Sequence, residues 1–252
     1  MAEPRLCPRV RNKLAEPAKS QTAAVLLAAG ESVRMGSPKP LLPWLGTTLI
    51  VYQIEQLLRA GLETVIVVLG HLAGPVAATL GTHPQVAIRV NPLYQRGKST
   101  SIVVGVEALP PEASAILLLA VDQPRRAETL QRLVSAHLSG NHLITVPIHE
   151  GRRGHPPVLA ASLIPELLGL SEETQGLRRI MNTHRTEIGE IVFDSEEVIF
   201  DLNTRQDYQR AHACFMKREV PTATYKSGGR KDRGSVNWTP SGSAVEESNS
   251  RP

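Results

Sequence analysis

The stretch Ala23-Ala24-Val25-Leu26-Leu27-Ala28-Ala29-Gly30 decides the fold class of this chain. Its seven consecutive apolar residues end at a glycine, which is typical of a short strand buried on both faces of a sheet. Further apolar runs occupy 64–70 and 115–121, and segments with helical periodicity separate them. This alternation predicts an α/β fold in three layers, with a mainly parallel, twisted sheet and helices on both faces.

The same patterns assign the other elements. We predict strands at 86–90, 143–147, 188–193 and 197–200, and an extended segment at 156–159 after a loop at 150–154. We predict helices at about 75–80, 99–109, 127–138, 163–168, 177–181 and 206–216. One more helix begins near Thr47 or Thr48, either of which could cap it. It ends at Gly61, because glycine readily adopts the left-handed conformation that closes a helix.

Charge is distributed unevenly along the 252 residues. Residues 1–20 carry five Lys or Arg against two Glu, and residues 217–252 carry seven Lys or Arg against four acidic residues. The central part, 21–216, therefore holds 16 basic and 18 acidic residues. A nucleic-acid-binding core would need basic residues clustered on its folded surface, so the sequence disfavours that class. We expect one domain at 21–216 between disordered tails at 1–20 and 217–252.

Nothing in the sequence indicates secretion or a membrane. The N-terminal residues lack the apolar segment of a signal peptide, and no apolar run reaches the roughly 18 residues of a membrane span. Cys7 and Cys214 are far apart and form no CxxC pair, which argues against a disulfide framework or a cysteine metal cluster. We expect a cytoplasmic protein.

The segment from Leu27 to Lys39, LAAGESVRMGSPK, follows the first strand and so lies at the carboxyl edge of the sheet, where open α/β folds bind ligands. Its small residues would let backbone N–H groups approach phosphate oxygens, and its Arg and Lys would add positive charge. It is neither a P-loop nor a dinucleotide fingerprint, because it lacks GxxxxGK[ST] and GxGxxG. A plain connecting loop is the alternative. We assign the nucleotide contacts to Leu27, Ala28, Ala29, Gly30, Arg34, Gly36 and Lys39.

This segment resembles the signature LAAGxSxRMGxxK of the molybdopterin nucleotidyltransferase-like (MobA-like) family, and every fixed position is matched. The resemblance extends over most of residues 22–212 and is closest to the molybdenum cofactor cytidylyltransferases. It implies the Rossmann-like, glycosyltransferase-A-type fold of nucleotidyltransferases. It also implies a Mg²⁺-dependent reaction between a nucleoside triphosphate and a phosphorylated acceptor.

A second loop, 91–101, resembles the family's segment before its third helix, where a glycine and a serine help to receive the nucleotide. On physical grounds alone, Gly97 and Ser99 at a helix N-terminus would suit an anion or a base. The alternative is that Ser99 only caps the helix. We assign Gly97, Ser99 and Ser101 to the nucleotide site.

Asp122 follows the most apolar strand of the chain. A carboxylate beside a phosphate loop would repel the phosphates unless a divalent cation lay between them, so we interpret Asp122 as a Mg²⁺ ligand. The alternative is that Asp122 caps the next helix or turns the chain. The resemblance adds to the metal interpretation, because family members carry a metal-binding Asp in a DxP motif at this point.

Asp201 and Asn203 lie in a segment that looks like the family's D-[IV]-[DN]-T-x-x-D and follow a predicted strand. Two residues apart on extended backbone, they would point to one side, and either could complete the metal site. An N-cap role for Asn203 or Thr204 is the alternative.

Three residues are assigned to the acceptor by the resemblance. Arg153 and His155 lie in a stretch that matches the family's GHP segment, and Arg178 lies in one that resembles an acceptor-side element. Positive charge and a glycine beside the histidine would suit a phosphate group.

These assignments give a direct displacement, in which an acceptor phosphate oxygen attacks the α-phosphorus and pyrophosphate leaves. Arg34, Lys39 and Mg²⁺ on Asp122 would supply alignment and charge neutralisation. The resemblance implies a molybdenum-bound pterin phosphate as the acceptor and a molybdoenzyme as the target protein. Ala28 and Ala29 favour CTP over GTP, because guanylyl-transferring relatives tend to have a glycine before Gly30. The alternatives are a transferase for sugar phosphates or other small phosphates, and a non-catalytic carrier of the cofactor.

Overall fold

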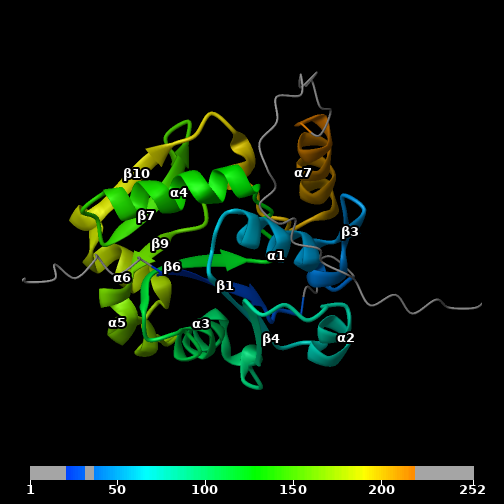
Figure 1. The fold of residues 1–252 in the computed structure, drawn as a ribbon, viewed down its shortest axis with the longest axis horizontal. Coiled ribbons are helices and arrows are strands. Elements are labelled where there is room, and N and C mark those ends of the chain that lie inside the picture. The colour runs from blue at the N-terminus through cyan, green and yellow to red at the C-terminus, as the bar shows by residue number, and fades with distance from the viewer. Residues whose placement is uncertain (1–20, 32–36, 219–252) are drawn as a thin grey trace, which may run out of the picture.

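The computed structural model describes residues 21–31 and 37–218, and these form an eight-stranded sheet between layers of helices (Figure 1). The strands of the sheet are β1 (Gln21–Ala28), β4 (Thr64–Leu69), β5 (Val86–Val90), β6 (Ala113–Ala120), β7 (Ile144–His149), β8 (Arg152–Arg153), β9 (Val158–Ala160) and β10 (Ile188–Val192). The α-helices are α1 (Leu49–Arg59), α2 (Ala73–Ala78), α3 (Lys98–Glu107), α4 (Ala127–Ser139), α5 (Ile164–Leu168), α6 (Leu177–Thr183) and α7 (Arg205–Arg218). Short 3-10 helices are η2 (Lys39–Leu41), η3 (Tyr94–Arg96), η4 (Ala161–Leu163), η5 (Arg185–Glu187) and η6 (Glu196–Ile199).

The strand order β10-β7-β9-β6-β1-β4-β5 determines where a ligand can bind. β1 lies at the centre and pairs in parallel with β4 on one side and β6 on the other, while β9 runs antiparallel between β6 and β7. The chain leaves β1 toward β4 and β5, and then returns across β1 to form β6. The carboxyl ends of β1 and β6 therefore flank the point where the winding direction reverses, which is the ordinary ligand crevice of open α/β sheets.

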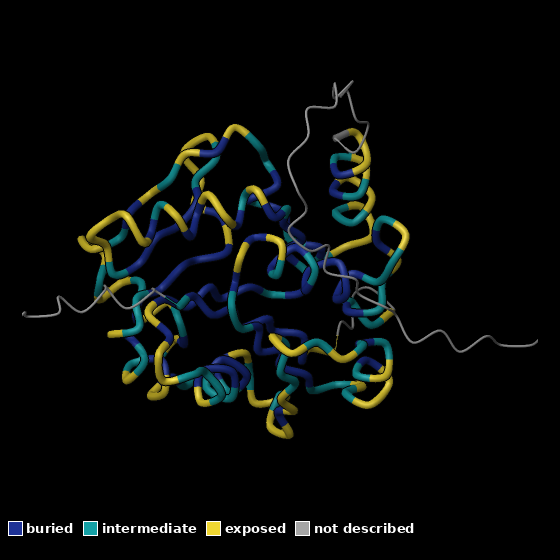
Figure 2. The backbone as a smooth tube through the Cα atoms, viewed as in Figure 1, coloured by how far each residue is buried: buried dark blue, intermediate teal, exposed yellow. Residues whose placement is uncertain are grey.

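Alternation along β1 divides the core into two layers. Ala24 and Leu26 join a cluster with residues of α1, α4 and α7, whereas Val25 and Leu27 join one with residues of α3, α5 and α6. The central strands are buried along their length, as the dark blue trace of Figure 2 shows. The α/β class, the three layers and the mainly parallel sheet expected from the sequence are confirmed.

The helix expected from Thr47 or Thr48 to Gly61 is α1, and Thr48 is its N-cap residue. The hydroxyl of Thr48 makes no capping hydrogen bond, so its expected capping role is wrong. At the other end, Gly61 has φ +88° and its N–H donates to Leu58 O, while Leu62 N–H donates to Leu57 O. This Schellman arrangement ends the helix as expected from the glycine.

The strand predicted at 197–200 is wrong, because these residues form η6 and the extended turn after it. The Ser195 hydroxyl accepts a hydrogen bond from Glu197 N–H, and the fully buried Glu197 carboxylate pairs with Arg126. A tertiary ion pair thus overrides the local preference for strand. The predicted loop at 150–154 also contains β8, which pairs with β7.

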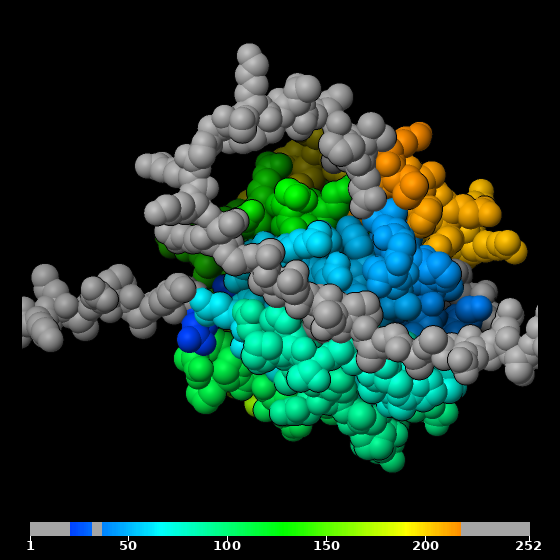
Figure 3. All heavy atoms as spheres, turned by 45° about the vertical axis from the view of Figure 1, so that its right-hand side comes forward, coloured from blue at the N-terminus to red at the C-terminus, as the bar shows by residue number. Residues whose placement is uncertain are grey.

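An unpredicted hairpin, β2 (Pro43–Trp44) and β3 (Thr47–Thr48), precedes α1. The turn residues Leu45 and Gly46 both have positive φ, as two-residue hairpin turns require. In Figure 3 the blue and cyan atoms of this hairpin and α1 lie between the teal atoms around α2 and the orange atoms of α7. No helix in 21–31 or 37–218 is long and apolar enough to cross a membrane.

Gly105 lets α3 approach β1 closely. A Cβ at this position would overlap Cγ1 of Val25 and lie 3.1 Å from Cγ2 of Val68. Gly105→Ala is therefore expected to lower the free energy of unfolding by about 1–3 kcal/mol, although alanine is the better helix former. Gly74→Ala in α2, where an added Cβ meets nothing within 4 Å, is the control and should raise that free energy by roughly 0.4–1 kcal/mol. Urea denaturation of both variants measures the difference, and an unchanged Gly105→Ala would contradict it.

Candidate active site

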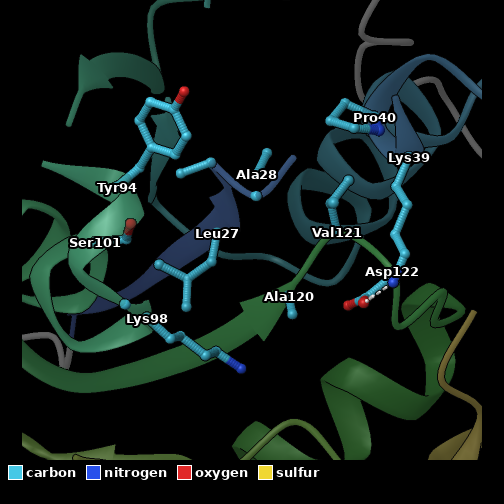
Figure 4. A pocket seen from close by; sticks show the side chains of 13 residues that line it. Leu27, Ala28, Lys39, Pro40, Tyr94, Lys98, Ser101, Ala120, Val121 and Asp122 are labelled. Carbon is cyan, nitrogen blue, oxygen red and sulfur yellow. Dashed lines mark hydrogen bonds and ion pairs between the residues drawn. The ribbon is translucent and has the colours of Figure 1, made fainter. Parts of the chain in front are cut away.

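A cavity of about 280 Å³ opens at the carboxyl ends of β1 and β6 (Figure 4). Eight of the predicted site residues line it: Leu27, Ala28, Ala29, Gly30, Lys39, Gly97, Ser101 and Asp122. Pro40, Tyr94, Lys98, Ala120 and Val121 complete the wall. Arg34 and Gly36 were also predicted here, but they lie outside the described residues.

Close backbone contacts build the wall formed by β1. A Cβ at Gly70, just after β4, would lie 2.7 Å from Tyr94 Cβ and 2.8 Å from Ala29 O. The N–H of His71 donates to Ala29 O at 3.0 Å, which holds the end of β1 against the end of β4. A side chain at Gly70 would therefore collide with Ala29 and Tyr94, so the glycine lets the ends of β1 and β4 and the segment of Tyr94 lie close together.

The start of α3 forms the facing wall. Gly97 is its N-cap residue with φ +115° and ψ 173°, a conformation that is essentially restricted to glycine. Ser101 lines the cavity, and its Oγ accepts a hydrogen bond of 2.9 Å from Asn91 Nδ2. Figure 4 shows Lys98, which the sequence reasoning missed, extending from α3 toward the side of the cavity formed by Ala120 and Asp122.

Ser99 has a different environment from the one expected. It lies inside the helix after Gly97, so it is not the N-cap, and it does not line the cavity. Its N–H donates to Glu172 Oε1 at 2.7 Å, and its buried Oγ has no hydrogen-bond partner within the described part of the chain. The α5–α6 connection packs against Gly97 and Ser99 through Glu172 and Gly176.

Gly97→Ala is expected to weaken nucleotide binding while leaving a folded protein. The new Cβ would overlap Glu172, and φ +115° disfavours any L side chain by about 1–3 kcal/mol. The start of α3 should shift, and with it Lys98 and Ser101. Calorimetric titration with nucleoside triphosphates measures the affinity, thermal unfolding serves as the check on folding, and an unaltered affinity would argue against a nucleotide at this wall.

Lys39 and Asp122 form an ion pair at the rim of the cavity. Nζ of Lys39 lies 2.7 Å from Oδ2 of Asp122 and 3.2 Å from Oδ1 of Asn203. The two charged side chains are only 14% and 24% exposed. Lys39, which was predicted to bind phosphate, thus contacts Asp122 and Asn203, which were predicted to bind a metal ion. It also leaves the proposed capping or turning role of Asp122 without a capping bond, since Arg126 is the N-cap residue of α4.

Thr204, not Asn203, caps α7. Asp207 N–H donates to Thr204 Oγ1, and Oδ2 of Asp207 accepts from Thr204 N–H, which is a reciprocal capping box. Asn203 is therefore available to Lys39, whereas Oδ1 of Asp201 accepts a hydrogen bond of 2.7 Å from Gln123 Nε2. Asp201 and Asn203 also border a second cavity of about 290 Å³, which is lined by Arg152, Ile199, Phe200, Asp201, Asn203, Asp207 and Arg210.

Arg125, which the sequence reasoning did not select, holds the loops of the site together. It is fully buried, and its guanidinium donates to the carbonyl oxygens of four residues: Pro124, His155, Val198 and Phe200. Burial lowers the pKa of Arg125 to about 10, and nearby carboxylates oppose that change, so the side chain stays charged at neutral pH. Gln53 of α1 completes this frame by donating to Gln123 O and accepting from Arg125 N–H. A single buried arginine gives no periodic pattern, so the role of Arg125 could not be predicted from the sequence.

Of the three residues predicted to bind the acceptor, His155 lines neither cavity, but it is hydrogen-bonded to Arg125 in the frame of the site. Its carbonyl accepts from Arg125, and its N–H donates to Val198 O. The residue keeps an exposed surface, yet loss of solvent around the ring lowers the pKa of His155, with Asp201 as the largest opposing influence. The imidazole is therefore neutral at pH 7 and can both donate and accept a hydrogen bond.

Arg153 and Arg178 line neither cavity. Nε of Arg153 pairs with Glu190 of β10 at 2.7 Å, while the preceding residue Arg152 borders the second cavity. Successive side chains of a strand point to opposite faces, so only one of the two arginines of β8 can face the site. Arg178 is exposed on α6.

The contacts of Lys39 indicate whether the oxygens of Asp122 and Asn203 would suit a metal ion. A cationic group already sits on one carboxylate oxygen and one amide oxygen, which are hard ligands of the kind that Mg²⁺ prefers. Within 21–31 and 37–218, no three His, Cys, Asp or Glu side chains cluster as a metal site. The arrangement fits an ion of which one or two ligands come from protein and others come from substrate phosphates.

Fold and cavity together are typical of the α/β proteins whose ligand site lies where the sheet changes its winding direction. The chain belongs to the family of MobA-like NTP transferase domains, whose model matches residues 24–188. The match includes β1 from Ala24 onward, together with Lys39, Gly97 and Asp122, but ends before Asp201 and Asn203.

Individual relatives carry several names. Nicotine blue oxidoreductase of Paenarthrobacter nicotinovorans is 32% identical over 195 residues, covering 74% of this chain and 94% of that protein. A Bacillus cereus protein named "Probable molybdenum cofactor guanylyltransferase" is 27% identical over 199 residues, covering 76% and 96%. Among solved structures, the manganese complex of Rv0371c from Mycobacterium tuberculosis H37Rv has a TM-score of 0.64 and 27% identity, covering 77% and 98%. The predicted family is confirmed.

Proposed function

We propose that this protein transfers a nucleoside monophosphate from a nucleoside triphosphate to a phosphorylated acceptor and releases pyrophosphate. The observation that carries the proposal is the cavity after β1, where backbone and small side chains of Ala28–Gly30 face Lys39, Lys98 and Asp122. Phosphate oxygens need N–H donors and cations at close range, and this wall offers both. Arg34, from the same loop, is proposed as a further phosphate contact.

A divalent ion, with Mg²⁺ as the expected one, would neutralise charge on the triphosphate when bound. Asp122 and Asn203 are the proposed protein ligands, because their oxygens already share one cationic group. Asp201 is the less favoured ligand, since Gln123 occupies one of its oxygens. The manganese complex of the mycobacterial relative supports a divalent metal in such proteins.

The second cavity is the proposed entry for the acceptor. It shares Asn203 and Asp201 with the proposed metal site, so an acceptor there would lie next to the triphosphate. Arg152 provides positive charge for an acceptor phosphate, whereas the guanidinium of Arg210 is paired with Glu196. His155 provides a neutral hydrogen-bonding ring nearby. Arg153 and Arg178 are not retained in this proposal, because neither lines a cavity and neither shares the hydrogen bond to Arg125 that places His155.

In the proposed reaction an oxygen of the acceptor phosphate forms a bond to the α-phosphorus, and the bond from that phosphorus to the bridging oxygen of the β-phosphate breaks. A phosphate oxygen is already ionised near neutral pH, so no side chain has to remove a proton. Lys39, Lys98 and the N–H groups of the first loop would align the triphosphate and stabilise the charge on departing pyrophosphate.

CTP is the proposed nucleotide, and a molybdenum-bound pterin phosphate is the proposed acceptor. Ala28 and Ala29 support CTP, and the Bacillus cereus relative, named for a molybdenum cofactor, supports the acceptor class. That relative is named for guanylyl transfer, so GTP is the competing nucleotide.

Pyrophosphate release tests the proposal. The full chain is mixed with Mg²⁺, each of the four nucleoside triphosphates, and either the pterin cofactor or a panel of sugar phosphates. Release with CTP and the pterin cofactor is the expected result, whereas release only with sugar phosphates would change the acceptor. Tight binding of the cofactor with no release in any combination would indicate a carrier instead.

A redox reaction is the second candidate, because one relative is named nicotine blue oxidoreductase. Oxidation of NADH or NADPH in the presence of nicotine blue, with no pyrophosphate release, would favour it.

A further inference from the structure

Lys39 occupies the position that a divalent cation would need. Its Nζ contacts Oδ2 of Asp122 and Oδ1 of Asn203 at 2.7 and 3.2 Å, and these are the two oxygens proposed as protein ligands of the metal. A Mg²⁺ ion binds oxygen at about 2.1 Å, so an ammonium 2.7 Å from the same oxygen would lie within about 5 Å of the ion. Two cations this close repel each other strongly, because solvent and salt screen charges poorly at a largely buried site, and each therefore weakens the binding of the other.

The side chain of Lys39 can also serve the neighbouring cavity. Lys39 lines that cavity, and in Figure 4 its chain descends from η2 past Val121 to Asp122. Pro38 and Pro40 on either side restrict the backbone, whereas four methylene groups leave the ammonium a wide reach. Oxygens of a triphosphate held at Ala28–Gly30 would compete with Asp122 and Asn203 for the ammonium.

We propose that Lys39 is an internal counter-ion that keeps the metal site closed until a nucleotide draws the ammonium onto its phosphates. Metal and nucleotide then bind cooperatively, and the protein without nucleotide has little affinity for free divalent cations. This inference rests on the proposed function, because it requires that Asp122 and Asn203 hold the metal.

Binding of Mn²⁺ in the absence of nucleotide tests the inference. The electron paramagnetic resonance signal of free Mn²⁺ reports the bound fraction for the full-length protein and its variants. Lys39→Met should bind Mn²⁺ about tenfold more tightly than the unmodified chain or better, because the competing charge is gone. Lys39→Arg retains the charge and should bind as weakly as the unmodified chain. Adding Asp122→Asn to Lys39→Met should abolish the gain.

Two further variants keep the test decisive. Lys39→Gln replaces Lys39→Met if thermal unfolding shows that the latter does not fold. Lys98→Met removes the other lysine of the cavity wall, and it should raise the Mn²⁺ affinity far less, since the ammonium held by Asp122 stays in place.

Equal Mn²⁺ affinity of the Lys39→Met variant and the unmodified chain overturns the inference. If the unmodified chain nevertheless releases pyrophosphate with Mg²⁺ and a nucleotide, only the counter-ion role fails and the proposed function stands. If no variant binds Mn²⁺ and no nucleotide yields pyrophosphate, the metal site and the proposed function fail together.

Discussion

Asp122→Asn is expected to reduce pyrophosphate release by roughly 10²–10³-fold, the size of effect seen when one contact to developing charge is lost. The amide keeps the shape of the side chain but lacks the negative charge that pairs with Lys39 and would hold a divalent ion. The fold should persist, because Asp122 Oδ2 binds a side chain at the cavity rim and not in the core. Single-turnover measurements at saturating nucleotide give the ratio.

Asp194→Asn is the matched control for this prediction. It makes the same chemical change at an exposed residue that lines neither cavity. Turnover of the control should equal that of the unmodified chain. Near-normal turnover of Asp122→Asn would rule out the carboxylate as a metal ligand that the reaction needs.

Arg125→Met should have the largest effect on stability, a loss of about 3–5 kcal/mol in the free energy of unfolding. Methionine approximates the aliphatic part of the side chain, but the carbonyl oxygens that now accept from the guanidinium would be buried without donors. These carbonyls belong to the segments that carry Asp122, His155 and Asp201. Turnover should therefore fall as well, even at temperatures where the variant is folded.

Urea denaturation measures this loss, and Arg59→Met provides the comparison. Arg59 is 68% exposed and lies 3.8 Å from Glu55, so its replacement should change stability by no more than about 0.5 kcal/mol. If the Arg125 variant unfolded like the Arg59 variant, the buried arginine would not be what joins the loops of the site.

The local pattern of the sequence was sufficient for most of the fold. Apolar runs such as 23–29 and 115–121 became β1 and β6, because continuous burial leaves a direct trace in composition. Gly61 ended α1 because its backbone conformation is a local property. The segment 197–200 was predicted wrongly, since burial of a charged pair between Glu197 and Arg126 has no periodic signal.

The position of the candidate site also followed from the sequence. Parallel strands bring their carboxyl ends to one edge, so Gly30 after β1 and Asp122 after β6 were expected at the same edge, and the pairing of β1 with β6 places the two strand ends next to each other. Lys98 stood in a loop that the sequence had already marked, but its entry into the cavity depended on how α3 begins at Gly97.

Only the tertiary structure decided which side chains form hydrogen bonds and ion pairs with one another. Lys39 meets Asp122 across 83 residues and Asn203 across 164, and no local pattern fixes which of several oxygens an ammonium will contact. The contact of Ser99 N–H with Glu172, across 73 residues, arose in the same way. The sequence by itself thus determined most of the buried positions, the positions of turns and the ends of strands, since these features depend on each residue and its neighbours in the chain. Only the folded chain decided which charges meet, because that depends on distances between segments that are far apart in sequence.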